Sequence, residues 1–213
     1  MYKYIFKNIF DRTFSFIIII MLSPILLIVS IINLFVNGRP ILFSQERPGK
    51  NKRIFRMYKF RSMSNKKDEQ GLLLPDEERL TKFGLFLRKT SIDELPSLLN
   101  ILKGDMSFIG PRPLLVKYLP YYTSKEQIRH TVKPGLTGLA QINGRNLLSW
   151  DKRLELDVKY VENMTLRNDL KIIFYTLKKV IKREDIVVGN DHIMEDFDVE
   201  RKNKIKTGDV KNV

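Results

Sequence analysis

The sequence predicts a membrane-associated α+β protein, in which a re-entrant helical hairpin precedes a compact mixed domain with amphipathic interfacial helices. Three observations support this prediction. Residues 13–38 contain no charged side chain, the residues after Arg39 show short strand and helix patterns, and 38 Lys and Arg against 24 Asp and Glu give a net charge of +14. Such a charge favours polyanionic partners, namely nucleic acid, an anionic bilayer surface or phosphorylated substrates.

Composition excludes several classes of protein. Apolar residues make up 43% of the 213-residue chain, which is enough for a folded core, so the chain is not a disordered polyampholyte. The chain has no cysteine, which rules out a disulfide framework, a thiolate zinc site and a cysteine nucleophile.

The uncharged segment is membrane material by length. A straight helix of about 26 residues would be roughly 39 Å long, more than a hydrocarbon core of about 30 Å. A signal peptide is not favoured, because the apolar run is too long and no cleavage site of small residues follows it.

The flanks of the segment predict that it enters and leaves on one side. The N-terminal flank carries Lys3, Lys7 and Arg12, and residues 39–61 carry eight Lys and Arg against a single Glu. Cytoplasmic segments collect Lys and Arg, so both ends are expected in the cytoplasm. Ser23-Pro24 lies at the middle, where a proline kinks a helix. We therefore expect residues 1–38 to form a re-entrant hairpin broken at Ser23-Pro24; the alternative is a kinked transmembrane helix.

Residues 39–188 are predicted to form the cytoplasmic catalytic domain. Alternating patterns and turn signals favour strands over 41–44, 54–60 and 136–142, and helices over 77–89, 95–102, 151–164 and 169–183. The last helix has an apolar side and a lysine-rich side, so it lies either in a membrane interface or against the core. Residues 189–213 are polar, and we expect a disordered tail.

A pair of adjacent carboxylates, Asp93 and Glu94, is the first candidate for chemistry. The pair lies in Ser91-Ile-Asp93-Glu94-Leu-Pro96 and could bind a divalent cation and supply a nucleophile. A structural interpretation explains the same string, because Ser91 and Glu94 have the spacing of a capping box and Asp93 could cap a helix that has Pro96 in its first turn.

Two further clusters are rich in proline and glycine. In Gly110-Pro111-Arg112-Pro113 the prolines hold Arg112 in an extended backbone, which suits bidentate contact with a phosphate; the alternative is a rigid surface loop. In the segment from Lys133 to Arg145 a tight turn could hold an anion, and the alternative is a plain hairpin turn. His130 has a weaker claim as an acid or base.

Together, and in this order, these segments resemble the small monotopic bacterial phosphoglycosyl transferases over nearly all of residues 2–183. Among these, the resemblance is greatest to the members that place N,N′-diacetylbacillosamine 1-phosphate on undecaprenyl phosphate. The segments that carry it are Tyr58-Lys59-Phe60-Arg61-Ser62-Met63, Ser91-Ile-Asp93-Glu94-Leu-Pro96, Asn100 to Ser107, Gly110-Pro-Arg-Pro113, Pro134 to Gly138, Gln141 and Asn143-Gly-Arg145.

The resemblance implies a reaction in which a UDP-sugar and undecaprenyl phosphate give undecaprenyl-diphospho-sugar and UMP. It implies that Asp93 is the nucleophile that carries a phospho-sugar, and that Glu94 and Asp93 hold Mg²⁺. The favoured sugar is an N-acetylated amino sugar. Substrate contacts are implied, more weakly for the last two, at Lys59, Arg88, Pro111, Arg112, Pro113, Arg145 and Asp157.

The same resemblance implies a place in the cell. We expect a monotopic protein on the cytoplasmic face of the bacterial inner membrane, in contact with anionic lipids and with downstream glycosyltransferases. Two other classes of function are alternatives. A non-catalytic basic membrane scaffold would use Asp93 and Glu94 only as helix caps. A nucleic-acid binder is suggested by charge alone, and no nucleic-acid-binding motif supports it.

Overall fold

The computed structural model describes residues 2–144, 148–182 and 195–207. Helices and strands are mixed in it, as the α+β prediction requires. The helices are α1 Lys7–Asn37, α2 Asp76–Arg79, α3 Lys82–Lys89, α4 Leu98–Lys103, α5 Leu139–Ile142, α6 Trp150–Glu162, α7 Leu166–Lys182 and α8 Phe197–Lys206. The strands are β1 Leu42–Pro48, β2 Ile54–Phe60, β3 Ser107–Ile109 and β4 Gly135–Thr137. Short 3-10 helices lie at Lys50–Lys52, Ile92–Ser97, Val116–Tyr121 and Glu126–Thr131, and a π-helical turn at Tyr2–Phe6.

Two small sheets form the centre of the domain. The strands β1 and β2 are an antiparallel hairpin in which Leu42 pairs with Phe60, and β3 and β4 are parallel. The first two predicted strands are confirmed. The third is correct only at its start, because the chain turns into α5 after Gly138. A Cβ at Gly138 would lie 2.1 Å from the carbonyl oxygen of Gly110, so the close approach of the two segments requires glycine there.

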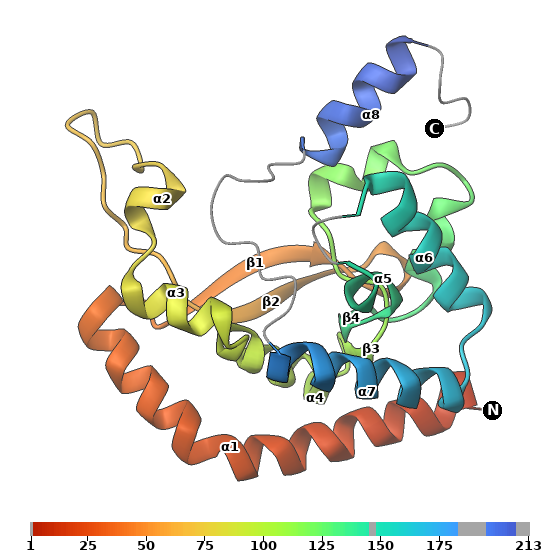
Figure 1. Ribbon diagram of the computed structural model, residues 1–213, viewed down its shortest axis with the longest axis horizontal. Coiled ribbons are helices and arrows are strands. Elements are labelled where there is room, and N and C mark those ends of the chain that lie inside the picture. The colour runs from red at the N-terminus through yellow and green to blue at the C-terminus, as the bar shows by residue number, and fades with distance from the viewer. Residues whose placement is uncertain (1, 145–147, 183–194, 208–213) are drawn as a thin grey trace.

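The long apolar helix α1 is continuous through Pro24. Proline cannot donate to the carbonyl of Ile20, four residues earlier, but the Ser23 hydroxyl donates to that same carbonyl at 2.8 Å. The break predicted at Ser23-Pro24 is therefore a bend rather than an interruption, as Figure 1 shows. Two separate hairpin arms are not confirmed. Among the described residues, α1 is the one helix long and apolar enough to cross a membrane.

Both ends of α1 are attached to the same folded domain. Near the start, Lys7 pairs with Asp169 at 2.5 Å and the Ser15 hydroxyl donates to the carbonyl of Leu98 at 2.7 Å. At the end, the Asn37 side-chain amide donates to the carbonyl of Arg61 at 3.2 Å. The buried residues of α1 are mostly polar and recur every four positions at each end: Lys7, Asp11, Ser15, Val29, Asn33 and Asn37.

The outer surface of α1 and that of α7 are apolar and exposed. In Figure 1, α7 lies alongside the N-terminal arm of α1 at one edge of the molecule. Phe35 on α1 is 83% exposed, and Ile181 on α7 is 80% exposed. Of the residues of α7 only Asp169 and Ile172 are buried, so its apolar side does not face the core. This favours the interfacial alternative for α7.

The opposite edge of the molecule is closed by α8. Phe197 is fully buried and packs against Tyr118, Tyr122 and Trp150. Arg201 pairs with Glu126 at 2.8 Å. The prediction of a disordered tail is wrong for this segment, because a single aromatic anchor and ion pairs fix an otherwise polar helix to the domain. The rest of the predicted tail lies largely outside the described residues.

Candidate active site

The segment that carries Asp93 and Glu94 is fixed to strand β2 by buried polar side chains. It is the 3-10 helix Ile92–Ser97, which leads directly into α4. The Asn100 side-chain amide donates to the carbonyl of Arg56 at 2.7 Å, while its oxygen accepts from the amide of Tyr58 at 3.0 Å. The Ser97 hydroxyl donates to the carbonyl of Tyr58 at 2.8 Å. These bonds place the pair of carboxylates opposite Lys59 on the same strand.

Glu94 is held between two cations. Its Oε1 accepts from Lys59 Nζ at 2.6 Å and from Arg112 Nη2 at 2.7 Å. The capping-box interpretation is wrong, because Ser91 makes no side-chain cap and has a left-handed backbone with φ of 57°. The pairing of Glu94 with Lys59 and Arg112 thus replaces the predicted capping contact.

The two neighbouring carboxylates are tuned in opposite directions. Burial raises the pKa of Asp93 to about 6, the adjacent Glu94 charge adds to this, and Lys59, Arg112 and Arg88 oppose it. Burial also acts to raise the pKa of Glu94, but Arg112 and Lys59 outweigh it and lower that pKa well below its usual range. A pair with separated pKa values is typical of a catalytic site, where one group reacts and the other organises charge.

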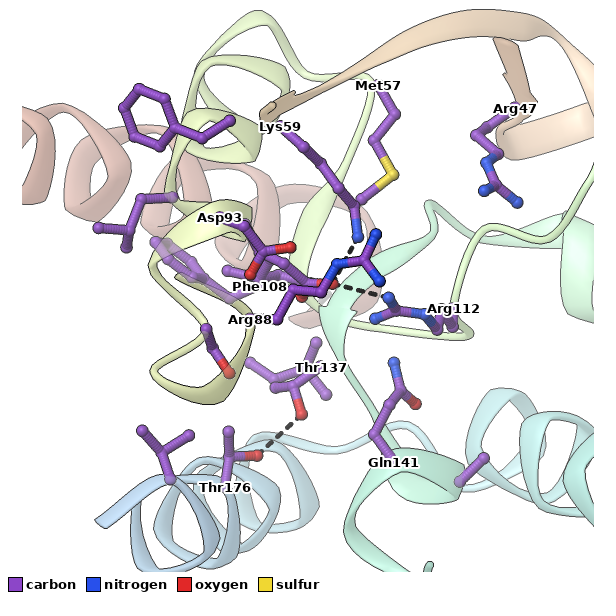
Figure 2. A pocket seen from close by; sticks show the side chains of 18 of the residues that line it. Arg47, Met57, Lys59, Arg88, Asp93, Phe108, Arg112, Thr137, Gln141 and Thr176 are labelled. Atoms are coloured by element: carbon purple, nitrogen blue, oxygen red, sulfur yellow. Dashed lines mark hydrogen bonds and ion pairs between the residues drawn. The ribbon is translucent and has the colours of Figure 1, made fainter. Parts of the chain in front are cut away.

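A third cation, Arg88, lies beside Asp93. Arg88 is in the last turn of α3, its Nε donates to the hydroxyl of Ser62 at 3.0 Å, and Figure 2 shows its side chain beside Asp93. A Cβ at Gly84 would lie 1.8 Å from the carbonyl oxygen of Ser62. Glycine thus allows α3 to pack directly on the end of β2, where Arg88 reaches the site.

The loop that carries Arg112 is fixed by hydrogen bonds to its backbone carbonyls. Arg129 donates to the carbonyl of Arg112 at 2.6 Å and to the carboxylate of Asp157 at 2.9 Å. The carbonyls of Pro111 and Pro113 accept from Gly135 and Arg47. Arg112 is therefore not a surface arginine on a free loop. Asp157 is almost fully buried and pairs with Arg129, and so it positions the loop.

These side chains share one large cavity. Its volume is about 1480 Å³. The residues of the predicted site that line it are Lys59, Arg88, Asp93, Glu94, Arg112 and Asp157. The cavity continues between Phe10, Phe14 and Ile18 of α1 and Leu170 and Leu177 of α7. The lining thus joins the cluster of charged side chains, several of which are labelled in Figure 2, to apolar side chains of the two exposed helices.

Three of the predicted site residues are not among the described residues that line the cavity. The buried prolines Pro111 and Pro113 are not among the lining residues, and Arg145 lies outside the described residues. His130 is buried away from the cavity, and burial followed by the charge of Arg129 lowers its pKa to about 3. The proposal of His130 as an acid or base is therefore wrong, because it stays neutral and cannot reach the cavity.

Three residues that line the cavity have no site role in the sequence-based prediction. Arg47 projects from β1 toward Arg112 in Figure 2, and burial, with the charge of Arg112, lowers its pKa to about 10. Arg153 lies one helical turn before Asp157 on α6. Gln141 lies on α5. The spacing of Arg153 and Asp157 is a sequence signal for a pair on one helix face. In the sequence, Arg47 follows the predicted strand over 41–44 and looks like part of a turn, whereas the structure extends β1 through it.

The carboxylates also fit a magnesium ion that is shared with a substrate. The described residues contain no group of three or more His, Cys, Asp and Glu that could hold a metal alone. Mg²⁺ rarely needs such a group, since one or two carboxylates, substrate phosphates and waters usually complete its shell. If Mg²⁺ binds here, Asp93 and Glu94 would supply the protein part of such a shell.

Comparison with known proteins shows the family. The family described as "Bacterial sugar transferase" matches residues 2–183. The chain is 51% identical over 194 residues to "Uncharacterized sugar transferase EpsL" of Bacillus subtilis, covering 91% of this chain and 96% of the relative. It is 40% identical over 185 residues to "UDP-glucose:undecaprenyl-phosphate glucose-1-phosphate transferase" of Klebsiella pneumoniae, covering 82% and 40%.

A third relative has a similar relation. The chain is 39% identical over 195 residues to "Undecaprenyl-phosphate galactose phosphotransferase" of Salmonella typhimurium, covering 84% of this chain and 41% of the relative. The chain thus spans less than half the length of these last two relatives. The family match includes the carboxylate pair and every cation described above. The chain therefore belongs to the bacterial sugar transferase family and is an enzyme of the transferase class.

Proposed function

We propose that this enzyme transfers a sugar 1-phosphate from a UDP-sugar to undecaprenyl phosphate, giving undecaprenyl-diphospho-sugar and UMP. The observation that carries the proposal is the single cavity that joins Asp93, Glu94 and their cations to an apolar passage between α1 and α7. A reaction between a charged sugar nucleotide and a lipid phosphate needs both environments. The names of the relatives from Klebsiella and Salmonella describe this chemistry.

In the first half of the proposed reaction, the carboxylate of Asp93 attacks the β-phosphorus of the UDP-sugar. A P–O bond to Asp93 forms, the P–O bond to the bridging oxygen breaks, and UMP leaves with that oxygen. Arg88 and Arg112 are placed to neutralise the charge of the transferring phosphoryl group. Lys59 and Arg112 keep the carboxylate of Glu94 ionised. Glu94 therefore does not act as a proton acceptor in this step.

In the second half, a phosphate oxygen of undecaprenyl phosphate attacks the same phosphorus. The bond to Asp93 breaks and its carboxylate is restored, and a new phosphoanhydride bond replaces the one that was broken. The covalent step splits one displacement into two. When bound, Mg²⁺ would supply charge neutralisation at the diphosphate, held by Asp93 and Glu94. No ATP is needed, because the number of phosphoanhydride bonds does not change.

The membrane placement that we propose is monotopic. A kinked transmembrane helix would put its two ends on opposite sides of the bilayer, whereas Lys7 and Asn37 at the two ends of α1 contact the same domain. The exposed apolar surfaces of α1 and α7 lie at one edge of the molecule, which supports a shallow insertion from one face. The basic flanks favour the cytoplasmic face of the inner membrane, with its anionic lipids.

Two details of the proposal come from the sequence resemblance alone. The donor is expected to carry an N-acetylated amino sugar such as N,N′-diacetylbacillosamine, and the product is expected to pass to downstream glycosyltransferases. The scaffold alternative is weaker, because it required Asp93 and Glu94 to cap a helix and neither does so.

The test is UMP release by purified protein in nanodiscs with undecaprenyl phosphate, Mg²⁺ and a panel of UDP-sugars, glucose, galactose, N-acetylglucosamine and N,N′-diacetylbacillosamine included. One sugar should give UMP, and EDTA should abolish release. The isosteric variant Asp93→Asn should lower the rate by at least about 1,000-fold.

Its melting temperature should not fall, since the variant removes a carboxylate that burial and Glu94 disfavour. A folded Asp93→Asn protein with near-normal turnover would refute the covalent role of Asp93.

A further inference from the structure

Gln141 is a buried side chain whose polar atoms have no partner. It is 8% exposed and lines the cavity. Among the described residues, it is the one side chain in which both a buried donor, Nε2, and a buried acceptor, Oε1, make no hydrogen bond. Leaving a buried polar group without a partner costs about 1–3 kcal/mol. A buried polar group that lowers the stability of the fold therefore calls for a functional explanation.

The surroundings hold the carboxamide in place without satisfying it. Figure 2 shows the Gln141 side chain pointing into the cavity on the side of Arg112. The guanidinium of Arg112 is bonded to Glu94, and the hydroxyl of Thr137 is paired with that of Thr176 at 2.8 Å. A Cβ at Gly138 would lie 2.9 Å from Gln141 Oε1. Gly138 therefore leaves room for Oε1 but has no side chain to pair with it, and Figure 2 shows the amide nitrogen pointing toward the side of the cavity where Arg112 lies.

The chemistry of the carboxamide selects which part of a substrate it can bind. A neutral amide presents one acceptor and two donor hydrogens, so a matching ligand group must both donate and accept. The ionised phosphates of a nucleotide sugar only accept, and an isoprenoid chain does neither. The groups that do both are the hydroxyl and acetamido groups of a sugar and the edge of a uracil ring.

We propose that Gln141 is a substrate-binding residue that recognises the neutral part of the UDP-sugar by a paired donor and acceptor. This inference rests on the proposed function. Arg88 and Arg112 hold the phosphates. Gln141 adds selectivity that charge cannot give, because only a ligand that both donates and accepts gains the hydrogen bonds that the amide lacks in the free enzyme.

The test is Gln141→Met, which keeps the length of the side chain and removes both polar atoms. The melting temperature should stay the same or rise, because the buried amide is unsatisfied in the free enzyme. The kcat/KM for the UDP-sugar should fall about 5- to 150-fold, which corresponds to about 1–3 kcal/mol.

A matched control is Gln127→Met, which lies outside the cavity. Its Oε1 accepts from Lys52 at 2.8 Å and its Nε2 donates to the carbonyl of Tyr122 at 3.3 Å. This variant should show the reverse pattern, with a lower melting temperature and an unchanged kcat/KM.

Binding of UMP identifies which group is recognised. If Gln141→Met weakens UMP and UDP-sugar equally, the uracil edge is the ligand; if only the UDP-sugar is weakened, it is the sugar. If the wild type turns over and Gln141→Met matches it in kcat/KM and in both affinities, the role of Gln141 is refuted while the proposed function stands. A wild type that neither binds UDP-sugar nor releases UMP refutes both.

Discussion

Asp169, near the start of α1, and the pair Asp93 and Gln141 all line the cavity, but the fold uses them in opposite ways. The carboxylate of Asp169 accepts from Tyr2 at 2.6 Å, Lys7 at 2.5 Å and Tyr160 at 2.9 Å, all within the protein. By contrast, Gln141 is unpartnered and Asp93 is disfavoured in its charged form. A polar group that the protein satisfies serves as an anchor. A polar group that the protein leaves unsatisfied retains its interaction energy for a ligand.

Asp169→Asn should give the largest effect, because it removes the charge that pairs with Lys7. The Lys7 side chain is 8% exposed and that of Asp169 is 2% exposed. Removing one partner of a buried pair costs about 3–5 kcal/mol. We expect this loss in unfolding free energy, measured by denaturant titration in detergent.

Asp151→Asn is the matched control, since Asp151 also contacts two cations, Arg201 and Lys204, but its side chain is 58% exposed. It should cost no more than about 1 kcal/mol. Equal losses for the two variants would mean that burial does not distinguish the anchor from a surface pair.

Leu27→Asp sharpens the comparison on the outer surface of α1. The inner side of α1 contacts the domain, so the outer side is free to insert into the bilayer. Leu27 lies on this outer side and is 62% exposed. A charged side chain in the apolar core of a membrane costs about 2.5–3.5 kcal/mol. We expect membrane affinity to drop about 100-fold in vesicle flotation, with the melting temperature in detergent unchanged.

The matched control is Leu72→Asp, since Leu72 is 63% exposed on a loop of the domain. It makes the same chemical change and should leave flotation unaltered. Equal loss of flotation for both variants would exclude α1 as the specific site of insertion.

How much of this could be predicted from the sequence differs between the two regions. The membrane segment, the first strand hairpin and the gathering of Asp93 and Glu94 with the basic motifs were all predictable, because apolar runs, alternation and motif identity are local features. The inner side of α1 was also present in the sequence, as Lys7, Asp11 and Ser15 four residues apart. An overall apolar composition concealed that spacing.

Other features depend on packing between distant segments. Gln141 is unsatisfied because its neighbours bond elsewhere: Arg112 pairs with Glu94, and Thr137 pairs with Thr176. No local sequence pattern encodes these pairings. The docking of α8 rests on Phe197 meeting three aromatic side chains, and one aromatic residue in a polar tail carries no periodic signal. The division of labour between Asp93 and Glu94 likewise depends on cations from three different elements.

The pH profile gives the smallest effect and tests the cavity side of the comparison. Because the pKa of Asp93 is raised to about 6, its carboxylate is mostly ionised at pH 7 and gains a proton as the pH falls through 6. Only the ionised form can attack, so kcat/KM should be halved near pH 6 and should fall tenfold per unit below it, about 1.4 kcal/mol of barrier per unit. The measurement is the rate of the UMP burst at low UDP-sugar concentration. Undecaprenyl phosphate is left out, so that titration of the acceptor does not contribute.

Gln141→Met should shift the height of this profile and not its midpoint, because glutamine does not titrate in this range. A burst that stays constant from pH 7 to pH 5 would mean that Asp93 is stabilised as an anion as well as Glu94 is. The distinction between polar groups held for the protein and polar groups held for the substrate would then fail at the residue where it matters most.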